Sequence, residues 1–154
     1  MKILNQQIFE NKEAAALPGL MESGGLPALV SGLSGIHRVN LAAALYERLE
    51  LPMFVVCPDD SAAESFTRDL ESMLGRPVNT LYSRDFTFYP SLAASREAEQ
   101  KRLYVLNALR CGESPVTVAT VSALMQRAIP PQTLGKATFT VKDGEPCPPE
   151  ELES

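Results

Sequence analysis

The chain has 154 residues, of which 45% are hydrophobic and 21% charged, and its formal net charge at pH 7 is −5. This length fits one domain with room for part of a second, and the composition is that of a globular protein rather than a disordered one. The acidic balance argues against broad, sequence-independent DNA binding by this chain alone, because such binding needs basic surface to neutralise phosphates.

The first half of the chain alternates helical and strand-like patterns. It predicts a helix at 11–21, a buried strand at 26–31, a glycine turn at 32–35, a helix at 37–49 and a second buried strand at 52–57. The second strand reads PMFVVC and is apolar on both faces, as strands of a parallel sheet tend to be.

The second half continues the alternation. Asp59 and Asp60 are read as capping and first-turn residues of a helix rather than as a catalytic carboxylate pair. The predicted elements are this helix to Leu74, a strand at 78–82, an aromatic loop at 83–92, a helix at 95–111, a strand at 115–119 and a short helix at 121–127. Residues 96–102 are read as a solvated helix face with i,i+4 ion pairs. This order of elements predicts an α/β fold with a parallel sheet.

Beyond Pro130 and Pro131 the pattern changes. Residues 136–142 (KATFTVK) alternate apolar and polar side chains, which predicts a half-exposed, antiparallel strand. We therefore expect one domain at 1–131 and the beginning of a second, truncated subdomain at 132–154.

The turn at 32–35 resembles a phosphate-binding loop without its chemistry. A working loop reads G-x-x-x-x-G-K-[ST], in which lysine reaches the phosphates and the hydroxyl holds Mg²⁺. With Gly32 on the first glycine, His37 replaces the second, Arg38 the lysine and Val39 the hydroxyl. Val39 has no oxygen to offer a cation, and the planar fork of Arg38 replaces lysine poorly. We expect a vestigial loop that binds no cofactor and holds no catalytic residue, made of Gly32, Ser34, Gly35, His37, Arg38 and Val39.

The cysteines, the single histidine and the apolar segments indicate which other kinds of site to expect. Cys57, Cys111 and Cys147 lack C-x-x-C spacing, and the chain has one histidine, so we expect reduced cysteines and no metal site, with Cys57 buried at a strand end. No apolar run approaches the ~20 residues that cross a bilayer. Since no signal peptide is visible either, we expect a cytoplasmic protein.

Several segments together carry a resemblance to a known family. They are GLSGIHRV, MFVVCPDDSAAE, DLESMLG, LYSRDFTFYPSLAASREAEQKRL, TVATVSALMQRAIPP and FTVKDGE. In this order they resemble the N-terminal region of bacterial transcription-repair coupling factors (Mfd), the part homologous to the damage-recognition helicase subunit UvrB. The similarity runs from about residue 10 to the C-terminus.

The resemblance implies a RecA-like (P-loop NTPase) fold that hydrolyses no ATP itself. In that family the larger protein releases RNA polymerase stalled at DNA lesions, using ATP and Mg²⁺ in a separate motor domain, and recruits excision repair through UvrA. Residues 1–131 would be the scaffold that packs on the rest of that protein, and 132–154 the start of the subdomain that docks UvrA. Most of the UvrA-contacting positions of the family have no counterpart here.

Two other function classes stay open at this point. A small nucleotide-binding enzyme with an atypical loop would use Arg38, which also stands where a helix N-terminus favours an anion. A module for single-stranded nucleic acid would stack bases on Phe86, Phe88 and Tyr89 beside Arg84. The acidic net charge instead favours packing of these aromatic side chains onto the sheet edge.

Overall fold

The computed structural model describes residues 7–25, 27–83 and 96–139. A short 3-10 helix η1 (Ile8–Glu10) comes first, and the other helices and strands follow it. They are α2 (Lys12–Glu22), α3 (Gly35–Leu49), β1 (Met53–Cys57), α4 (Asp60–Leu74), β2 (Asn79–Leu81), α5 (Arg96–Cys111), β3 (Val116–Thr120), α6 (Val121–Met125) and α7 (Pro131–Lys136).

The strands form a parallel sheet in the order β1-β3-β2. Val118 in the middle of β3 pairs with Val55 of β1 on one side and with Thr80 of β2 on the other. All five residues of β3 are buried, as expected for a strand with neighbours on both sides. The predicted α/β class with a parallel sheet is confirmed.

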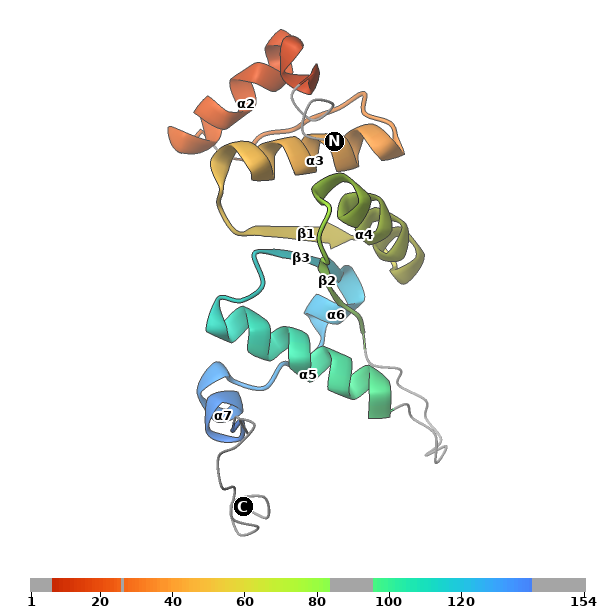
Figure 1. Cartoon of the computed structure of the whole chain (residues 1–154), viewed down its shortest axis with the longest axis vertical. Coiled ribbons are helices and arrows are strands. Elements are labelled where there is room, and N and C mark those ends of the chain that lie inside the picture. The colour runs from red at the N-terminus through yellow and green to blue at the C-terminus, as the bar shows by residue number, and fades with distance from the viewer. Residues whose placement is uncertain (1–6, 26, 84–95, 140–154) are drawn as a thin grey trace.

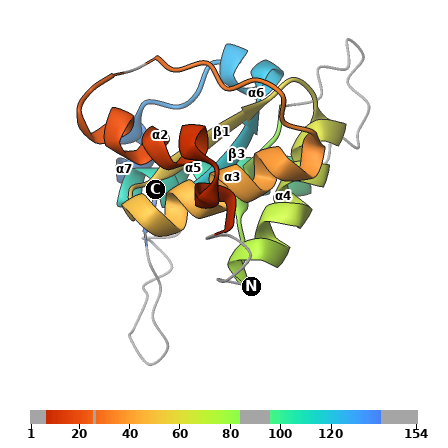
Figure 2. The same ribbon diagram turned by 90° about the horizontal axis from the view of Figure 1, so that it is seen from above.

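Helices cover both faces of the sheet, as Figure 1 shows in side view and Figure 2 from above. On one face α3 and α4 pack through side chains such as Val39 and Leu70 against Val116 and Val118. On the other face α5 and α6 pack against Leu81 and Ala119. The core therefore has two parts with β3 between them.

Local signals place both ends of α4 as predicted. The Asp59 side chain accepts a hydrogen bond from the backbone N–H of Ala62 at 2.8 Å, and Gly75 ends α4 with a φ of +68°. Both features match the preference of helix N-caps for Asp and of left-handed C-caps for glycine. The reading of Asp59 and Asp60 as cap and first-turn residues is confirmed.

The strand predicted at 26–31 is wrong over residues 27–31, and residue 26 lies outside the described ranges. Residues 27–31 lie outside the sheet and are exposed, with 95% of Leu29 accessible to solvent. An apolar run becomes a strand only where a neighbour accepts its backbone hydrogen bonds and covers its side chains. Within the described part of the chain, no strand pairs with this segment.

The strand predicted at 136–142 is also wrong over the residues that the structure describes. Lys136 ends α7, and residues 137–139 form no strand; residues 140–142 lie outside the described ranges. Pro131 occupies the first helical turn, where its missing N–H costs nothing, and Leu134 is buried. Lys136, the first residue of the predicted strand, therefore belongs to a helix, and no described strand pairs with residues 137–139. The boundary predicted at residue 131 stays a prediction.

One further expectation fails for β1. The strand was predicted to be buried on both faces, but Phe54 and Val56 are 46% and 50% exposed. The reason is positional, because β1 is an edge strand and α5 and α6 cover only the part of that sheet face formed by β2 and β3.

The described helices include none with the length and apolarity that crossing a bilayer requires.

Candidate functional site: the glycine loop at the start of α3

The backbone of the loop turns the chain directly into α3. Gly32 has a φ of +82°, a left-handed conformation that glycine adopts without the steric cost of a Cβ. Ser34 is the N-cap residue, and its carbonyl oxygen accepts the first helical hydrogen bond, from the Arg38 N–H at 3.1 Å. Gly35 opens the helix two residues earlier than predicted. A turn into a helix start is thus present, as the sequence indicates.

The polar side chains of the loop are bonded to the loop itself. Ser34 Oγ lies 2.8 Å from His37 Nδ1, and the Ser34 side chain makes no capping bond to the helix. Arg38 donates from Nε to the Leu33 carbonyl oxygen at 3.2 Å. Both contacts are exposed, as expected for His37 early in a helix. The positively charged guanidinium of Arg38 is therefore hydrogen-bonded to the backbone of the loop itself.

Val39 occupies the position where a working phosphate-binding loop carries its metal-binding hydroxyl. Its side chain is only 2% exposed and belongs to the core cluster that includes Ala43 and Val118. This position therefore serves packing between α3 and the sheet. A divalent cation needs oxygen ligands, which an aliphatic side chain does not offer.

A hollow of about 480 Å³ lies beside the loop, at the carboxyl end of β1. Open parallel sheets place their ligands at this end of the strands. The charged side chains that line it are Arg38 and Asp69, and most of the others are apolar, including Phe66. A single positive side chain, Arg38, facing a single negative one, Asp69, offers little net attraction for a polyphosphate. Burial, followed by the negative charge of Asp59, raises the pKa of the Cys57 thiol in the same wall.

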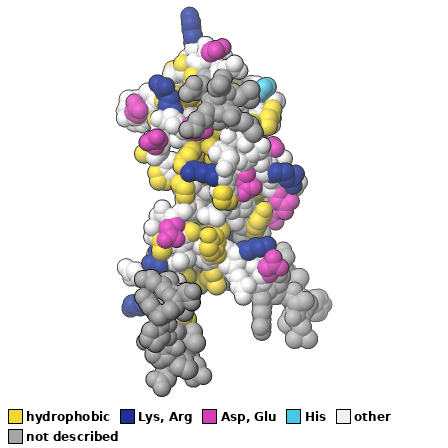
Figure 3. Space-filling model, in the orientation of Figure 1, with side chains coloured by type: hydrophobic (Ala, Val, Ile, Leu, Met, Phe, Trp, Pro, Cys, Tyr) yellow, Lys and Arg dark blue, Asp and Glu magenta, His cyan; other side chains and the backbone are white. Residues whose placement is uncertain are grey.

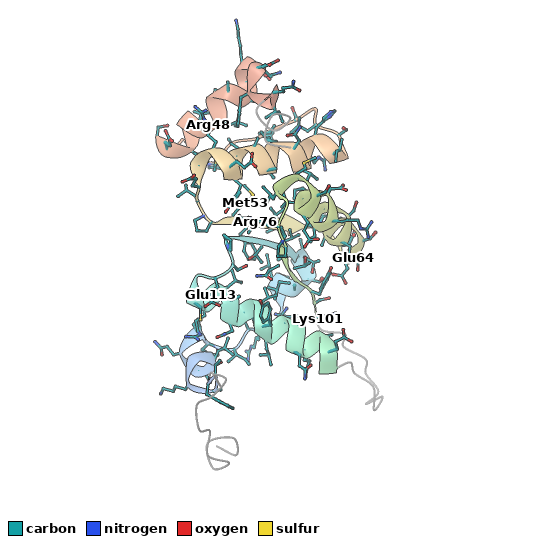
Figure 4. The ribbon with its side chains drawn as sticks, viewed as in Figure 1. Arg48, Met53, Glu64, Arg76, Lys101 and Glu113 are labelled. Carbon is teal, nitrogen blue, oxygen red and sulfur yellow. The ribbon has the colours of Figure 1, made fainter. Side chains whose placement is uncertain are left out.

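A second hollow, of about 320 Å³, follows the carboxyl end of β2 and has no counterpart in the sequence analysis. Glu64 of α4 and Lys101 of α5 line it, and both are labelled in Figure 4. Tyr82 also lines it, and its pKa is raised first by burial and then by the charge of Glu64. Lys101 Nζ lies 2.8 Å from Glu97 Oε1, which confirms an i,i+4 pair on this helix. Because three separate elements supply its walls, no single sequence motif predicts this hollow.

Arg102 departs from the predicted solvated face of α5. It is only 4% exposed and donates to the Tyr82 carbonyl oxygen at 2.7 Å and to the Ala123 carbonyl oxygen at 3.2 Å. The signal was present in the sequence, because Arg102 lies three residues before the buried Val105 and so shares its helix face. A charged residue on an apolar helix face is better read as a buried donor to backbone carbonyls.

Several predicted site residues lie outside the described residues. They are Arg84, Phe86, Phe88, Tyr89 and Cys147. Stacking of bases on these aromatic side chains therefore stays a prediction. Among the described residues, no group of three or more His, Cys, Asp or Glu side chains is placed to hold a metal ion. On the face that Figure 3 shows, acidic and basic side chains are interspersed, with no single basic patch.

Fold and loop together define an α/β protein with a parallel sheet and a glycine turn into a helix. The chain is 30% identical over 154 residues to the transcription-repair-coupling factor of Bacillus subtilis (strain 168), and the match spans 96% of this chain and 13% of that protein. The chain is thus related in sequence to a small part of a transcription-repair coupling factor, which confirms the resemblance. No family model matches the chain, and no solved structure matches it significantly.

Proposed function

We propose that this chain is a non-catalytic scaffold and protein-interaction module of a transcription-repair coupling factor. The observation that carries the proposal is the relationship to such a factor over 96% of the chain. The loop geometry supports the non-catalytic part, because Arg38 is bonded to the Leu33 carbonyl and Val39 is a core residue. The fold would be RecA-like, with a loop retained for the turn it makes rather than for phosphate binding.

The proposed partners are those that the family resemblance implies. The longer protein would release stalled RNA polymerase from DNA with an ATP-driven translocase in a separate domain, and this chain would position the subdomain that docks UvrA. Exposed helices of the module would pack against the rest of that protein. Packed helices and a sheet hold a docking element in a fixed place better than a loop does.

A variant comparison in the full-length coupling factor that carries this chain tests the proposal. Leu70→Ala opens a cavity at a fully buried position, so it should destabilise the module by about 2–5 kcal/mol. We expect it to weaken UvrA binding in calorimetry while DNA-stimulated ATP hydrolysis is unchanged. Arg38→Ala should change neither quantity.

Leu29→Ala is the matched control, because it removes a similar side chain from a 95% exposed position. It should leave UvrA binding and ATP hydrolysis as they are in the unaltered protein. A loss of ATP hydrolysis in Arg38→Ala would contradict the proposal, since the loop would then take part in the chemistry. Normal UvrA binding by Leu70→Ala at a temperature where the module unfolds would remove the scaffold role.

A nucleotide-binding enzyme is the second candidate, and one observation favours it. The hollow at the carboxyl end of β1 adjoins the start of α3, where free N–H groups and Arg38 together favour an anion. This reading predicts affinity for MgATP that falls in Arg38→Ala. Direct titration with nucleotide separates it from the scaffold.

A further inference from the structure

No strand among the described residues pairs with the outer edge of β1. The Met53 N–H donates to the Pro115 carbonyl oxygen at 2.8 Å, so Met53 directs its backbone polar groups toward β3. Successive residues of a strand direct these groups to opposite sides. Phe54 and Val56 therefore direct their N–H and C=O groups away from β3, toward the open edge.

The side chains of the same two residues lie on a half-covered sheet face. Their neighbours on this face, Ala119 of β3 and Leu81 of β2, are buried under α5 and α6. Phe54 and Val56 are about half exposed. At Phe54 and Val56, therefore, the backbone lacks a described strand partner and the side chains are only partly covered.

β1 also lacks the features that protect natural edge strands. Such strands carry charges, proline or bulges that prevent pairing with other chains. The strand reads MFVVC, with no charged residue and no proline between Met53 and Cys57. This is the composition of an interior strand of a parallel sheet.

The strand-like segment at 27–31 does not fill this edge. It runs in the same general direction as β1 in both views but takes no place in the sheet (Figures 1 and 2). Residues 28–33 instead line a hollow of about 490 Å³ together with Leu17 and Leu20 of α2.

We propose that the open edge of β1 binds one further strand, supplied by the longer polypeptide and running parallel to β1. The proposal rests on the proposed function, since the match spans only 13% of the relative and leaves most of such a protein to supply the strand. Backbone hydrogen bonds to Phe54 and Val56 would hold the strand, and its apolar side chains would cover theirs.

A second copy of this chain is the other occupant to be tested. Two copies related by a twofold axis would pair their β1 edges antiparallel, whereas both described strand pairs of this sheet are parallel. A strand of the longer polypeptide can instead continue the parallel arrangement.

Hydrogen exchange resolved to single residues tests the proposal on the 154-residue chain and on the full-length coupling factor. In the chain alone, we expect the amides of Phe54 and Val56 to exchange rapidly and those of Val55 and Cys57, which face β3, slowly. In the full-length protein, exchange at Phe54 and Val56 should slow by at least about tenfold, while Val55 and Cys57 stay protected.

Three results would overturn the proposal. Rapid exchange at Phe54 and Val56 in the full-length protein would mean that no strand binds there. Protection in the chain alone that grows with its concentration would identify a second copy. Protection in the chain alone at every concentration would mean that a segment of this same chain fills the edge. If UvrA still binds while Phe54 and Val56 stay unprotected, only this inference fails and the proposed function stands.

A lysine substitution adds a second readout. Val56→Lys places a charge at a half-exposed position, so it should leave the unfolding midpoint of the 154-residue chain unchanged and abolish the protection of Phe54 in the full-length protein. Tyr104→Lys, at a 68% exposed position on α5, is the control and should keep that protection. Protection of Phe54 that survives Val56→Lys would contradict a strand at this edge.

Discussion

Arg38 and Val39 are neighbours in the sequence with opposite surroundings. Arg38 is exposed and donates to the Leu33 carbonyl, whereas Val39 is buried in the core. Successive residues of a helix point about 100° apart, so a chain that exposes one at this site turns the next toward the sheet. Restoring a metal-binding hydroxyl at position 39 would therefore place it among apolar side chains.

Val39→Thr tests this account of the loop. The hydroxyl would be buried in an apolar cluster, so we expect the free energy of unfolding to fall by about 1–3 kcal/mol, measured by urea denaturation. Ile36→Thr is the matched control at a half-exposed position and should change stability by less than about 0.5 kcal/mol. Equal stability of Val39→Thr and the unaltered chain would show that position 39 is not packed as described.

Cys57 and Cys111 should differ in reactivity. Burial, followed by Asp59, raises the pKa of the Cys57 thiol, whereas Cys111 is exposed. Because the thiolate is the nucleophile, we expect iodoacetamide near pH 8 to modify Cys57 at least about tenfold more slowly, measured by peptide mass spectrometry. Equal rates in the folded protein would contradict the burial of Cys57.

The raised pKa of Cys57 predicts how the stability of the fold depends on pH. The folded state holds the Cys57 proton more tightly than the unfolded state does. The resulting stabilisation is fully present below the ordinary thiol pKa and is lost as the pH rises through the folded value. Tyr82, whose pKa is also raised by burial, contributes with the same sign at higher pH. The alkaline loss of stability should therefore be smaller in Cys57→Ala.

At the scale of elements, Arg102 joins β2, α5 and α6. Its guanidinium donates to carbonyl oxygens of Tyr82, which follows β2, and of Ala123 in α6. Arg102→Met keeps much of the side-chain volume but leaves both carbonyls without this donor, so we expect a loss of about 2–4 kcal/mol in urea unfolding. Lys101→Met, which removes an exposed ion pair one residue away, should cost less than about 1 kcal/mol. Similar losses in the two variants would contradict the bridging role.

Elements with a cap and a periodic stripe were predictable from the sequence. α4 has both, with Asp59 at its start and Gly75 at its end, and the structure confirms its range. The two predicted strands that the structure contradicts, over residues 27–31 and 136–139, have strand-like composition but no paired neighbour in the described residues. Strand formation depends on distant partners that local sequence does not contain.

Only part of the candidate site could be predicted from the sequence. The turn at Gly32 and the helix after it followed from the glycines, and the exposure of His37 from its place early in the helix. The bond from Arg38 to Leu33 and the hollow near Tyr82 did not, because they depend on side-chain conformations and on helices that meet only in the folded chain.

At the scale of the whole molecule, the described residues give the sheet one covered face, one half-covered face and an edge at β1 with no paired strand. The relationship to a coupling factor spans this chain and a small part of that protein. In the proposed function, the chain would complete its sheet with another segment and hold a docking element, and neither role uses a reactive group. Variants that disturb packing should then have the larger effects.

Calorimetric titration of the 154-residue chain with MgATP and MgADP, at low salt and without sulfate, tests the central claim most directly. The scaffold account predicts no binding heat at millimolar nucleotide, with Arg38→Ala indistinguishable from the unaltered chain. Micromolar binding that is lost in Arg38→Ala would contradict it, because the glycine loop would then be a working nucleotide site.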